Sequence, residues 1–359
     1  MKILFVINTM QGGGAARVTS ILANQLSRKG CAVSIATNLS KQCTYYVSPE
    51  IGLYNIYGHR HKFSSIFSRF LDHVFKLRKV LACFQPDIVI GEQEDGMAMA
   101  KCALLFSNTP IIGHRHNSFK ILGLSKLQRL LFNSVNYSVF LHKTDVSFVG
   151  NRIKNKTSIY NPCSYSIVNV NQHEKKKILA VVGSIRRYKD KGFDLVLDIW
   201  GTIAKKYPDW TLCIIGGGSD DNKDFLMKKT SKLGISNQVV FTGIVDDVDK
   251  RLQAASIFLL PSRVEGFPMV LNEAISQGCA CVCFSLKGVT KELYSKGAVL
   301  QVDDGDTENF CKMVEKLILD IELREKLSKQ AQIELQKYLP DKIVNDWVSL
   351  IDKVMNLKS

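Results

Sequence analysis

The chain has 359 residues, of which 46% are hydrophobic, and its 48 Lys and Arg against 33 Asp and Glu give a formal net charge of +15. This composition excludes a predominantly disordered protein, and the length predicts two domains at roughly 100–200 residues each. No apolar run approaches the roughly 20 residues that span a bilayer, and the opening stretch Ile3 to Ile7 is too short for a secretory signal. We therefore expect a cytoplasmic protein.

The positive charge is concentrated in the first half of the chain. Residues 1–165 hold 20 Lys and Arg against 7 Asp and Glu, whereas the remaining residues hold 28 against 26. Such asymmetry indicates an anionic partner for the first half: nucleic acid, anionic lipid or a phosphorylated substrate. Because no recognition-helix or aromatic RNA-binding signature accompanies the charge, we expect no nucleic-acid partner.

Short apolar runs alternate with helical patterns throughout, which is typical of parallel βαβ units. The predicted strands of the first half are Lys2–Asn8, Ala32–Thr37, Ile88–Gly91, Ile111–Gly113 and Val146–Val149. The predicted helices between them are Ala15–Lys29, Ser64–Phe84 and Lys126–Leu141. The pattern stops at Asn161-Pro162, and a polar bridge that ends at Lys177 is a candidate linker.

A second series of the same kind follows. Its predicted strands are Ile178–Gly183, Thr211–Ile215, Val239–Thr242, Ile257–Leu260 and Ala280–Phe284. Its predicted helices are Leu195–Lys206, Lys223–Leu233 and Met269–Gln277, with closing helices at Glu308–Leu335 and Asp341–Leu357. We therefore predict an α/β protein with two Rossmann-like domains that face each other across a cleft, where ligands bind at the carboxyl ends of the strands.

The first glycine-rich loop and the cysteines predict neither NAD nor a metal. Met10-Gln11-Gly12-Gly13-Gly14 joins the first strand to the first helix, so its amides can approach a phosphate. The dinucleotide fingerprint, however, requires glycine where Arg17 stands. The ten cysteines contain no CxxC pair, and Cys279, Cys281 and Cys283 alternate as small apolar residues of one buried strand face.

The most specific pattern is Glu265-Gly266-Phe267-Pro268-Met269-Val270-Leu271-Asn272-Glu273. Its Gly-Phe-Pro turn precedes a helical run and presents backbone amides at a helix N-terminus, which suits a diphosphate. Glu265 precedes the helix and Glu273 lies about one turn inside it, so the two carboxylates can hold different parts of one ligand. Between Gly183 and Asp194, four cations follow another strand, as in a phosphate clamp: Arg186, Arg187, Lys189 and Lys191.

These residues carry a resemblance to the GT-B-fold glycosyltransferases of family 4, which transfer a sugar from a nucleotide donor with retention of anomeric configuration. The resemblance covers essentially the whole chain and rests most specifically on the Glu-x7-Glu pair, together with Lys191-Gly192-Phe193-Asp194 and the first glycine-rich loop. It implies an acceptor- and membrane-facing domain of residues 1–165 and a nucleotide-sugar-binding domain of residues 175–340. A final helix within 341–359 is expected to pack back on the first domain.

The resemblance also implies roles for single residues. Glu265 would contact hydroxyls of the transferred sugar, Glu273 the ribose hydroxyls, and Lys191 the leaving phosphates. The donor would bind to the turn from Gly266 through Pro268 to Val270 and to the loop glycines Gly13 and Gly14. The base of the donor would lie near Val245. Ser184 stands where the family usually has Arg, so the second cation would come from Arg186 or Arg187, and the sequence leaves both open.

A histidine pair follows the strand at Ile111–Gly113. By the resemblance, His116 faces the transferred sugar or the acceptor, and His114 is the alternative residue for this role. A histidine that only caps the end of the strand would give the same pattern. With no obvious nucleophile, the resemblance implies front-face substitution, in which the protein supplies positioning and charge stabilisation. We expect metal-independent activity, because cations and amides would take the place of a divalent ion.

Residues 64–84 predict a basic amphipathic helix, typical of an anchor on anionic lipid, although an ordinary domain helix with solvated cations would have the same pattern. Its cations are Arg69, Lys76, Arg78 and Lys79, and His59-Arg60-His61-Lys62-Phe63 leads into it. The helix is similar to that of the GalNAc transferases of bacterial protein N-glycosylation, which act on polyprenyl-diphosphate-linked glycans.

The sequence thus predicts a retaining glycosyltransferase on the inner face of the cytoplasmic membrane, acting in polysaccharide or glycoprotein glycan assembly. The donor would be a UDP-sugar carrying an N-acetylhexosamine or galactose, and the acceptor a lipid-linked glycan. The alternatives are a transferase with another nucleotide sugar or a soluble acceptor, a GT-B epimerase or inverting transferase, and a non-catalytic nucleotide-sugar sensor.

Overall fold

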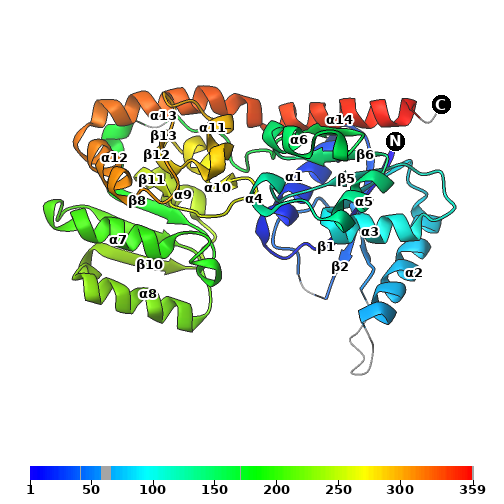
Figure 1. The fold of residues 1–359 in the computed structure, drawn as a ribbon, viewed down its shortest axis with the longest axis horizontal. Coiled ribbons are helices and arrows are strands. Elements are labelled where there is room, and N and C mark those ends of the chain that lie inside the picture. Colours follow the sequence, from blue (N-terminus) through cyan, green and yellow to red (C-terminus); the bar gives the residue numbers. More distant parts are fainter. Residues whose placement is uncertain (41, 58–65, 170, 358–359) are drawn as a thin grey trace. The chain divides into compact units, whose positions relative to one another are not determined.

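The computed structural model of the protein describes residues 1–40, 42–57, 66–169 and 171–357. The chain forms two compact units: a first unit of Met1–Pro162 with Tyr338–Ser359, and a second unit of Cys163–Lys337 (Figure 1). The expected ends of the two domains, at 165 and 340, lie three residues beyond the ends of these units, whereas the second unit begins at Cys163, 12 residues before the expected 175. Each unit is described by itself.

The first unit is built on seven parallel strands in the order β3-β2-β1-β4-β5-β6-β7. The strands are β1 (Lys2–Thr9), β2 (Ala32–Asn38), β3 (Gly52–Asn55), β4 (Ile88–Glu92), β5 (Ile111–His114), β6 (Tyr137–Phe140) and β7 (Lys156–Ser158). β1 lies between β2 and β4, and its apolar residues are buried because helices cover both faces of a parallel sheet.

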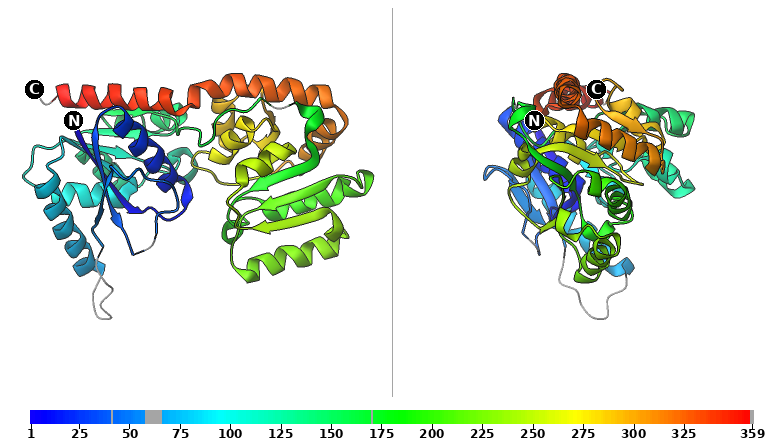
Figure 2. Two further views of the ribbon diagram at one scale, coloured as in Figure 1. Left: turned by 180° about the vertical axis from the view of Figure 1, so that it is seen from behind. Right: turned by 90° about the vertical axis from the view of Figure 1, so that its left-hand side faces the viewer.

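The helices of this unit are α1 (Gly13–Arg28), α2 (Ile66–Phe84), α3 (Gln93–Ala103), α4 (Phe119–Leu122), α5 (Lys126–Ser134), α6 (Lys143–Val149) and α14 (Pro340–Asn356). α1 joins β1 to β2 and α3 joins β4 to β5, in opposite directions along the sheet, so right-handed crossovers place them on opposite faces. The C-terminal helix α14 packs against α1 (Figure 2), and α3 packs against both α2 and α5.

Two predictions for the first unit are wrong. Val146–Val149, expected as a strand, belongs to α6, whose first amides, from Asp145 and Val146, bond to the carbonyl of His142. The expected helix Lys126–Leu141 ends at Ser134 and is followed by strand β6. Short apolar runs do not distinguish a buried strand from a buried helix, and tertiary pairing decided both cases. Residues 59–65, part of the expected basic helix and its lead-in, lie outside the described residues.

The second unit is built on six parallel strands in the order β10-β9-β8-β11-β12-β13. They are β8 (Lys176–Val182), β9 (Thr211–Ile215), β10 (Val239–Gly243), β11 (Ala255–Leu260), β12 (Ala280–Phe284) and β13 (Leu300–Val302). The helices are α7 (Phe193–Ile203), α8 (Asp220–Leu233), α9 (Val248–Ala254), α10 (Met269–Ser276), α11 (Val289–Leu293), α12 (Thr307–Leu319) and α13 (Ile321–Leu335). The two parallel sheets confirm the predicted α/β class with two Rossmann-like domains.

The expected single helix Glu308–Leu335 is two helices. Asp320 has extended backbone between α12 and α13, and its side chain accepts a 2.8 Å bond from the amide of Leu323, which caps α13. An N-cap aspartate stabilises a helix start by roughly 1 kcal/mol, enough to interrupt an otherwise continuous helical pattern. In the described part of the chain, no helix is both long and apolar enough to cross a bilayer.

Candidate active site

The site in the second unit begins at two neighbouring strands in the middle of the sheet. β8 pairs with β9 on one side and with β11 on the other. The chain leaves β8 and β11 in loops 183–192 and 261–268, at the same carboxyl edge of the sheet. In an open α/β sheet, ligands bind where the strand order reverses, which here is between β8 and β11.

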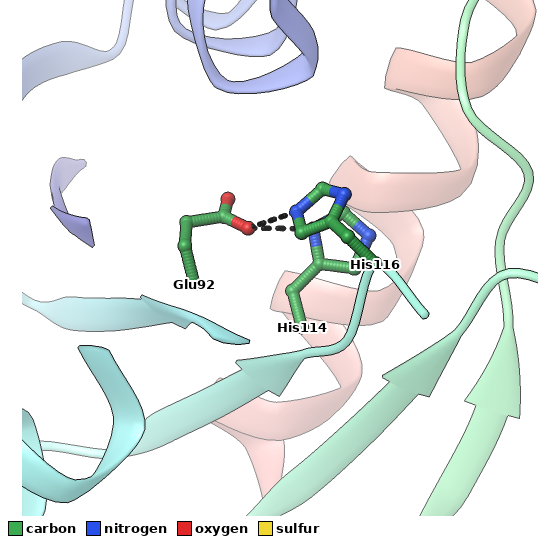
Figure 3. A group of neighbouring side chains, drawn as sticks. All are labelled: Glu92, His114 and His116. Atoms are coloured by element: carbon green, nitrogen blue, oxygen red, sulfur yellow. Dashed lines mark hydrogen bonds and ion pairs between the residues drawn. The ribbon is translucent and has the colours of Figure 1, made fainter. Parts of the chain in front are cut away.

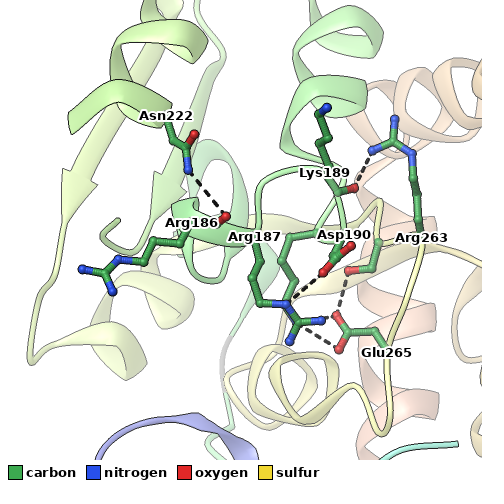
Figure 4. Close-up of polar contacts among 9 residues, drawn as sticks. Arg186, Arg187, Lys189, Asp190, Asn222, Arg263 and Glu265 are labelled. Atoms are coloured by element: carbon green, nitrogen blue, oxygen red, sulfur yellow. Dashed lines mark hydrogen bonds and ion pairs between the residues drawn. The ribbon is translucent and has the colours of Figure 1, made fainter. Parts of the chain in front are cut away.

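Lys191 and Glu265 meet between these two loops (Glu265 is labelled in Figure 4). The Lys191 ammonium donates to both carboxylate oxygens of Glu265, at 2.7 and 2.9 Å, and the Ser262 hydroxyl donates to Oε1 at 2.7 Å. The Glu265 side chain is 8% exposed and that of Lys191 17%. Two residues 74 positions apart therefore form a largely buried ion pair at the sheet edge.

Gly192 allows the two loops to approach each other. Its φ is +68°, and a Cβ there would lie 1.9 Å from the carbonyl oxygen of Pro261. Arg263 completes the junction, since its amide donates to the Asp190 carbonyl at 2.7 Å and its guanidinium makes two bonds to Asp194, at 2.8 and 2.9 Å. The position of Lys191 is consequently held by backbone on both sides.

The two candidate arginines point in different directions. The guanidinium of Arg187 donates to Asp190 at 3.0 Å, whereas that of Arg186 points away from Glu265 (Figure 4). Arg187 is therefore the arginine on the side of the Lys191–Glu265 pair.

The Glu-x7-Glu turn leads into α10, which begins at Met269 with Pro268 at its N-cap. Phe267, Met269 and Val270 form the helix start, where the Met269 amide donates to the Phe267 carbonyl at 2.8 Å and the Leu271 amide to the Pro268 carbonyl at 2.9 Å. Glu273 is 1% exposed, and its carboxylate accepts a 3.0 Å bond from the Ser164 hydroxyl. The burial excludes a merely solvated glutamate on a helix surface.

A second glycine run, Gly216-Gly217-Gly218, follows β9 and was not predicted as part of the site. A Cβ on Gly216 would lie 2.0 Å from the Gly183 carbonyl, and one on Gly217 would lie 2.3 Å from the Ile244 side chain. This run thus packs beneath the cation loop and beside the residues before Val245. Its strand–glycine–helix pattern was the available sequence signal.

In the first unit, Gly13 and Gly14 open helix α1. Gly12 and Gly13 have φ values of +62° and +79°, and a Cβ on either would meet no atom within 4 Å. The Gly12 amide donates to the Thr44 hydroxyl at 2.9 Å. These glycines are required by backbone conformation and leave open space beside the helix start.

The carboxyl edge of the first sheet carries a buried group of Glu92, His114 and His116 (Figure 3). His116 Nε2 lies 2.6 Å from Glu92 Oε2, and His114 Nδ1 lies 3.0 Å from the same oxygen. Burial alone raises the pKa of Glu92, but the two histidines outweigh burial and hold the pKa at about 2. Burial lowers the pKa of His114. Glu92 was missed in the sequence, although it ends the strand beside the histidines.

The cations predicted to bind a membrane have intramolecular contacts. Lys76 pairs with Asp72 at 2.8 Å, and Arg78 donates to the Cys102 and Ala103 carbonyls at 3.3 Å each. Lys79 lies 4.8 Å from the centre of the Phe75 ring, and the Arg69 side chain is half-buried on the same helix.

Two family models match the chain. The model for glycosyl transferases group 1 matches residues 166–334, and the model for glycosyltransferase family 4 matches residues 12–149. The chain is a glycosyltransferase of this type.

The glycosyltransferase has relatives of the same length. It is 28% identical to an uncharacterised glycosyltransferase of Haemophilus influenzae over 97% of this chain and 98% of that one. It is 26% identical, over 99% of both chains, to the GalNAc-alpha-(1->4)-GalNAc-alpha-(1->3)-diNAcBac-PP-undecaprenol alpha-1,4-N-acetyl-D-galactosaminyltransferase of Campylobacter jejuni. A lipopolysaccharide 1,6-galactosyltransferase of Salmonella typhimurium is 34% identical over 39% of this chain and 42% of its own length.

Solved structures share its fold. The lipopolysaccharide outer core galactosyltransferase WaaB superposes with a TM-score of 0.74 and 20% identity over 98% of this chain and 99% of its own. Alr3699/HepE of Anabaena, solved with UDP and glucose, superposes with a TM-score of 0.79 and 16% identity over 98% and 100%. The glycosyltransferase thus has the GT-B fold.

Proposed function

We propose that this glycosyltransferase moves a sugar from a UDP-sugar to a polyprenyl-diphosphate-linked glycan with retention of anomeric configuration. The observation that carries the proposal is the Lys191–Glu265 pair beside the start of α10. It combines a cation for a diphosphate, backbone amides for its oxygens and a carboxylate for sugar hydroxyls. The names of the C. jejuni and S. typhimurium relatives support an N-acetylhexosamine or galactose.

Each site residue then has a chemical task. Glu273 accepts from ribose hydroxyls, and Glu265 accepts from hydroxyls of the transferred sugar. Lys191 and Arg187 neutralise the leaving diphosphate, and the Val245 region receives the base. A ligand phosphate that approaches Lys191 gives the ammonium a second anion and releases part of the Glu265 carboxylate for the sugar.

The mechanism that fits these residues is a front-face substitution. The bond from the sugar C1 to the diphosphate oxygen breaks while the acceptor oxygen bonds to C1 on the same face. The departing diphosphate takes the acceptor proton. The protein contributes positioning and electrostatic stabilisation, which can supply several kcal/mol when charge develops in a fixed, partly buried site.

A nucleotide-sugar screen tests the donor assignment. UDP and one UDP-sugar should raise the melting temperature of the wild type, because a ligand that binds the folded protein stabilises it by mass action. Glu273→Gln should reduce this stabilisation, and Glu308→Gln, on the exposed first turn of α12, is the matched control. No stabilisation by any nucleotide sugar would overturn the donor assignment, and a product of inverted configuration by NMR would overturn retention.

We also propose that the first unit lies on an anionic membrane surface. Besides α2, which exposes Leu71 and Phe75, the α4–α5 segment exposes Leu122, Leu127 and Leu130 by 58%, 77% and 68%. Lys120, Lys126 and Arg129 accompany these leucines, and residues 118–134 contain no Asp or Glu. Exposed leucines among cations match a bilayer with anionic headgroups, to which each cation contributes about 1 kcal/mol.

Liposome sedimentation tests this surface. The double variant Leu127→Ser/Leu130→Ser should bind vesicles of phosphatidylglycerol more weakly than the wild type. Leu319→Ser is the control, because Leu319 is 73% exposed but lies in the second unit. Unchanged binding by the double variant would remove α5 from the membrane surface.

A further inference from the structure

The buried group of Glu92, His114 and His116 is built by the sheet. Glu92 is the last residue of β4 and His114 the last of β5, and the two are paired in the parallel ladder. Beyond the strand, the Arg115 amide donates to the Val139 carbonyl at 3.0 Å, which fixes the backbone that leads to His116. The register of two strands places Glu92 beside His114, and the bond of the Arg115 amide presents His116 two residues beyond β5.

The carboxylate has no other compensating charge. Among the described residues, the ion pairs of Glu92 are those to His114 and His116 alone, and its side chain is fully buried. Arg115, which lies between the two histidines in the sequence, pairs with Glu94 and stacks on the Phe119 ring. From α14, the group meets the edge of the Trp347 ring, which lies 4.9 Å from His114 and carries no charge. A buried anion of this kind requires a partner that can become positive.

His116 is that partner. Its Nε2 lies at hydrogen-bonding distance, 2.6 Å, from the carboxylate, whereas its Nδ1 is buried and has no hydrogen-bond partner among the described residues. The bond made by one imidazole nitrogen sets the tautomer and leaves the other nitrogen for a substrate. An unpaired buried polar atom destabilises a fold, so one that is retained at the carboxyl edge of the sheet points to a ligand there.

We propose that Glu92 is a positioning residue for His116. It holds Nε2–H of the ring, so that Nδ1 accepts a hydrogen bond from a hydroxyl of the sugar or acceptor. It also supplies the negative charge that stabilises the ring when positive charge develops on it. His114 contacts the same carboxylate oxygen from the other side and restricts its rotation. The inference rests on the proposed function, since it assigns the orientation of one residue in that site.

Kinetics test the proposal with Glu92→Gln, which keeps the shape of the side chain and removes its charge. We expect a 10- to 100-fold lower kcat, which is typical of the loss of an orienting group. The acid limb of the pH–rate profile should be displaced, and the stabilisation of the folded protein by UDP should be unchanged. The double variant Glu92→Gln/His116→Gln should be no slower than His116→Gln. A kcat and pH profile equal to those of the wild type, or effects that simply add in the double variant, would overturn the positioning role.

A spectroscopic test is independent of turnover. In protein labelled with ¹⁵N-histidine, His116 of the wild type should be the Nε2–H tautomer, and Glu92→Gln should lose this preference. An Nδ1–H tautomer in the wild type would overturn the proposal, as would one equivalent of zinc in the purified protein, since the same three residues can ligate a metal. If the tautomer is found but no sugar is transferred, the proposed function fails while the orientation of His116 stands.

Discussion

Removal of the Lys191 ammonium should affect stability and catalysis differently. In Lys191→Met, the Glu265 carboxylate, 8% exposed, keeps only the 2.7 Å bond from Ser262. In a fully buried ion pair, removal of one partner lowers the free energy of unfolding by about 3–5 kcal/mol. Because the Lys191 side chain is 17% exposed, water can replace part of its contact, so we expect about 2 kcal/mol. That loss corresponds to a melting temperature lower by about 4–8 °C.

A double-variant cycle separates this stability effect from function. Lys191→Met/Glu265→Gln removes both charges and should regain at least about 1 kcal/mol relative to Lys191→Met, because no buried charge is left unpaired. Lys191→Met, Glu265→Gln and the double variant should nevertheless each lose at least about 100-fold in kcat/KM, the loss typical of a removed electrostatic contact to the transition state. Urea unfolding and a radiolabelled UDP-sugar transfer assay measure the two quantities.

Lys189→Met is the matched control, because the Lys189 side chain, although it lies in the same cation loop, is exposed and points away from Glu265 (Figure 4). It should resemble the wild type in both assays. The reasoning is refuted if Lys191→Met keeps wild-type turnover, or if the double variant is less stable than Lys191→Met.

Further expectations concern stability, pH and metal. The Lys175 ammonium donates to the carbonyls of Gln253, Ala255 and Gln277 at 2.8–2.9 Å. Lys175→Met should therefore lower the free energy of unfolding, measured by urea titration, by about 2–3 kcal/mol. Lys176→Met, at an exposed position, is the control and should leave it unchanged. The pKa of Glu92 is about 2, against an ordinary 4.5. The stabilisation of the folded state by the Glu92 carboxylate is therefore complete above pH 4.5 and is lost as the pH falls towards 2. Between those values the wild type should lose about 3 kcal/mol more than Glu92→Gln, and equal losses in acid would contradict this assignment. EDTA should leave sugar transfer unchanged, and a loss that added metal reverses would overturn metal independence.

Local sequence patterns were sufficient for most elements and for the turn that opens α10. β1 and β11 are continuous apolar runs, and the turn before α10 follows from Gly266 and Pro268, because strands, helix starts and turns are encoded by neighbouring residues. Patterns failed where a short apolar run fits either element, as at α6 and β6.

The contacts within the candidate sites could not be read in the same way. Strand order brings Lys191 to Glu265 across 74 positions, and strand register places Glu92 opposite His114. Side-chain directions likewise separate Arg187 from Arg186. A sequence specifies which residues end each strand, but only the packed sheet determines which strands are neighbours and which ends meet, because those pairings depend on burial summed over the whole domain.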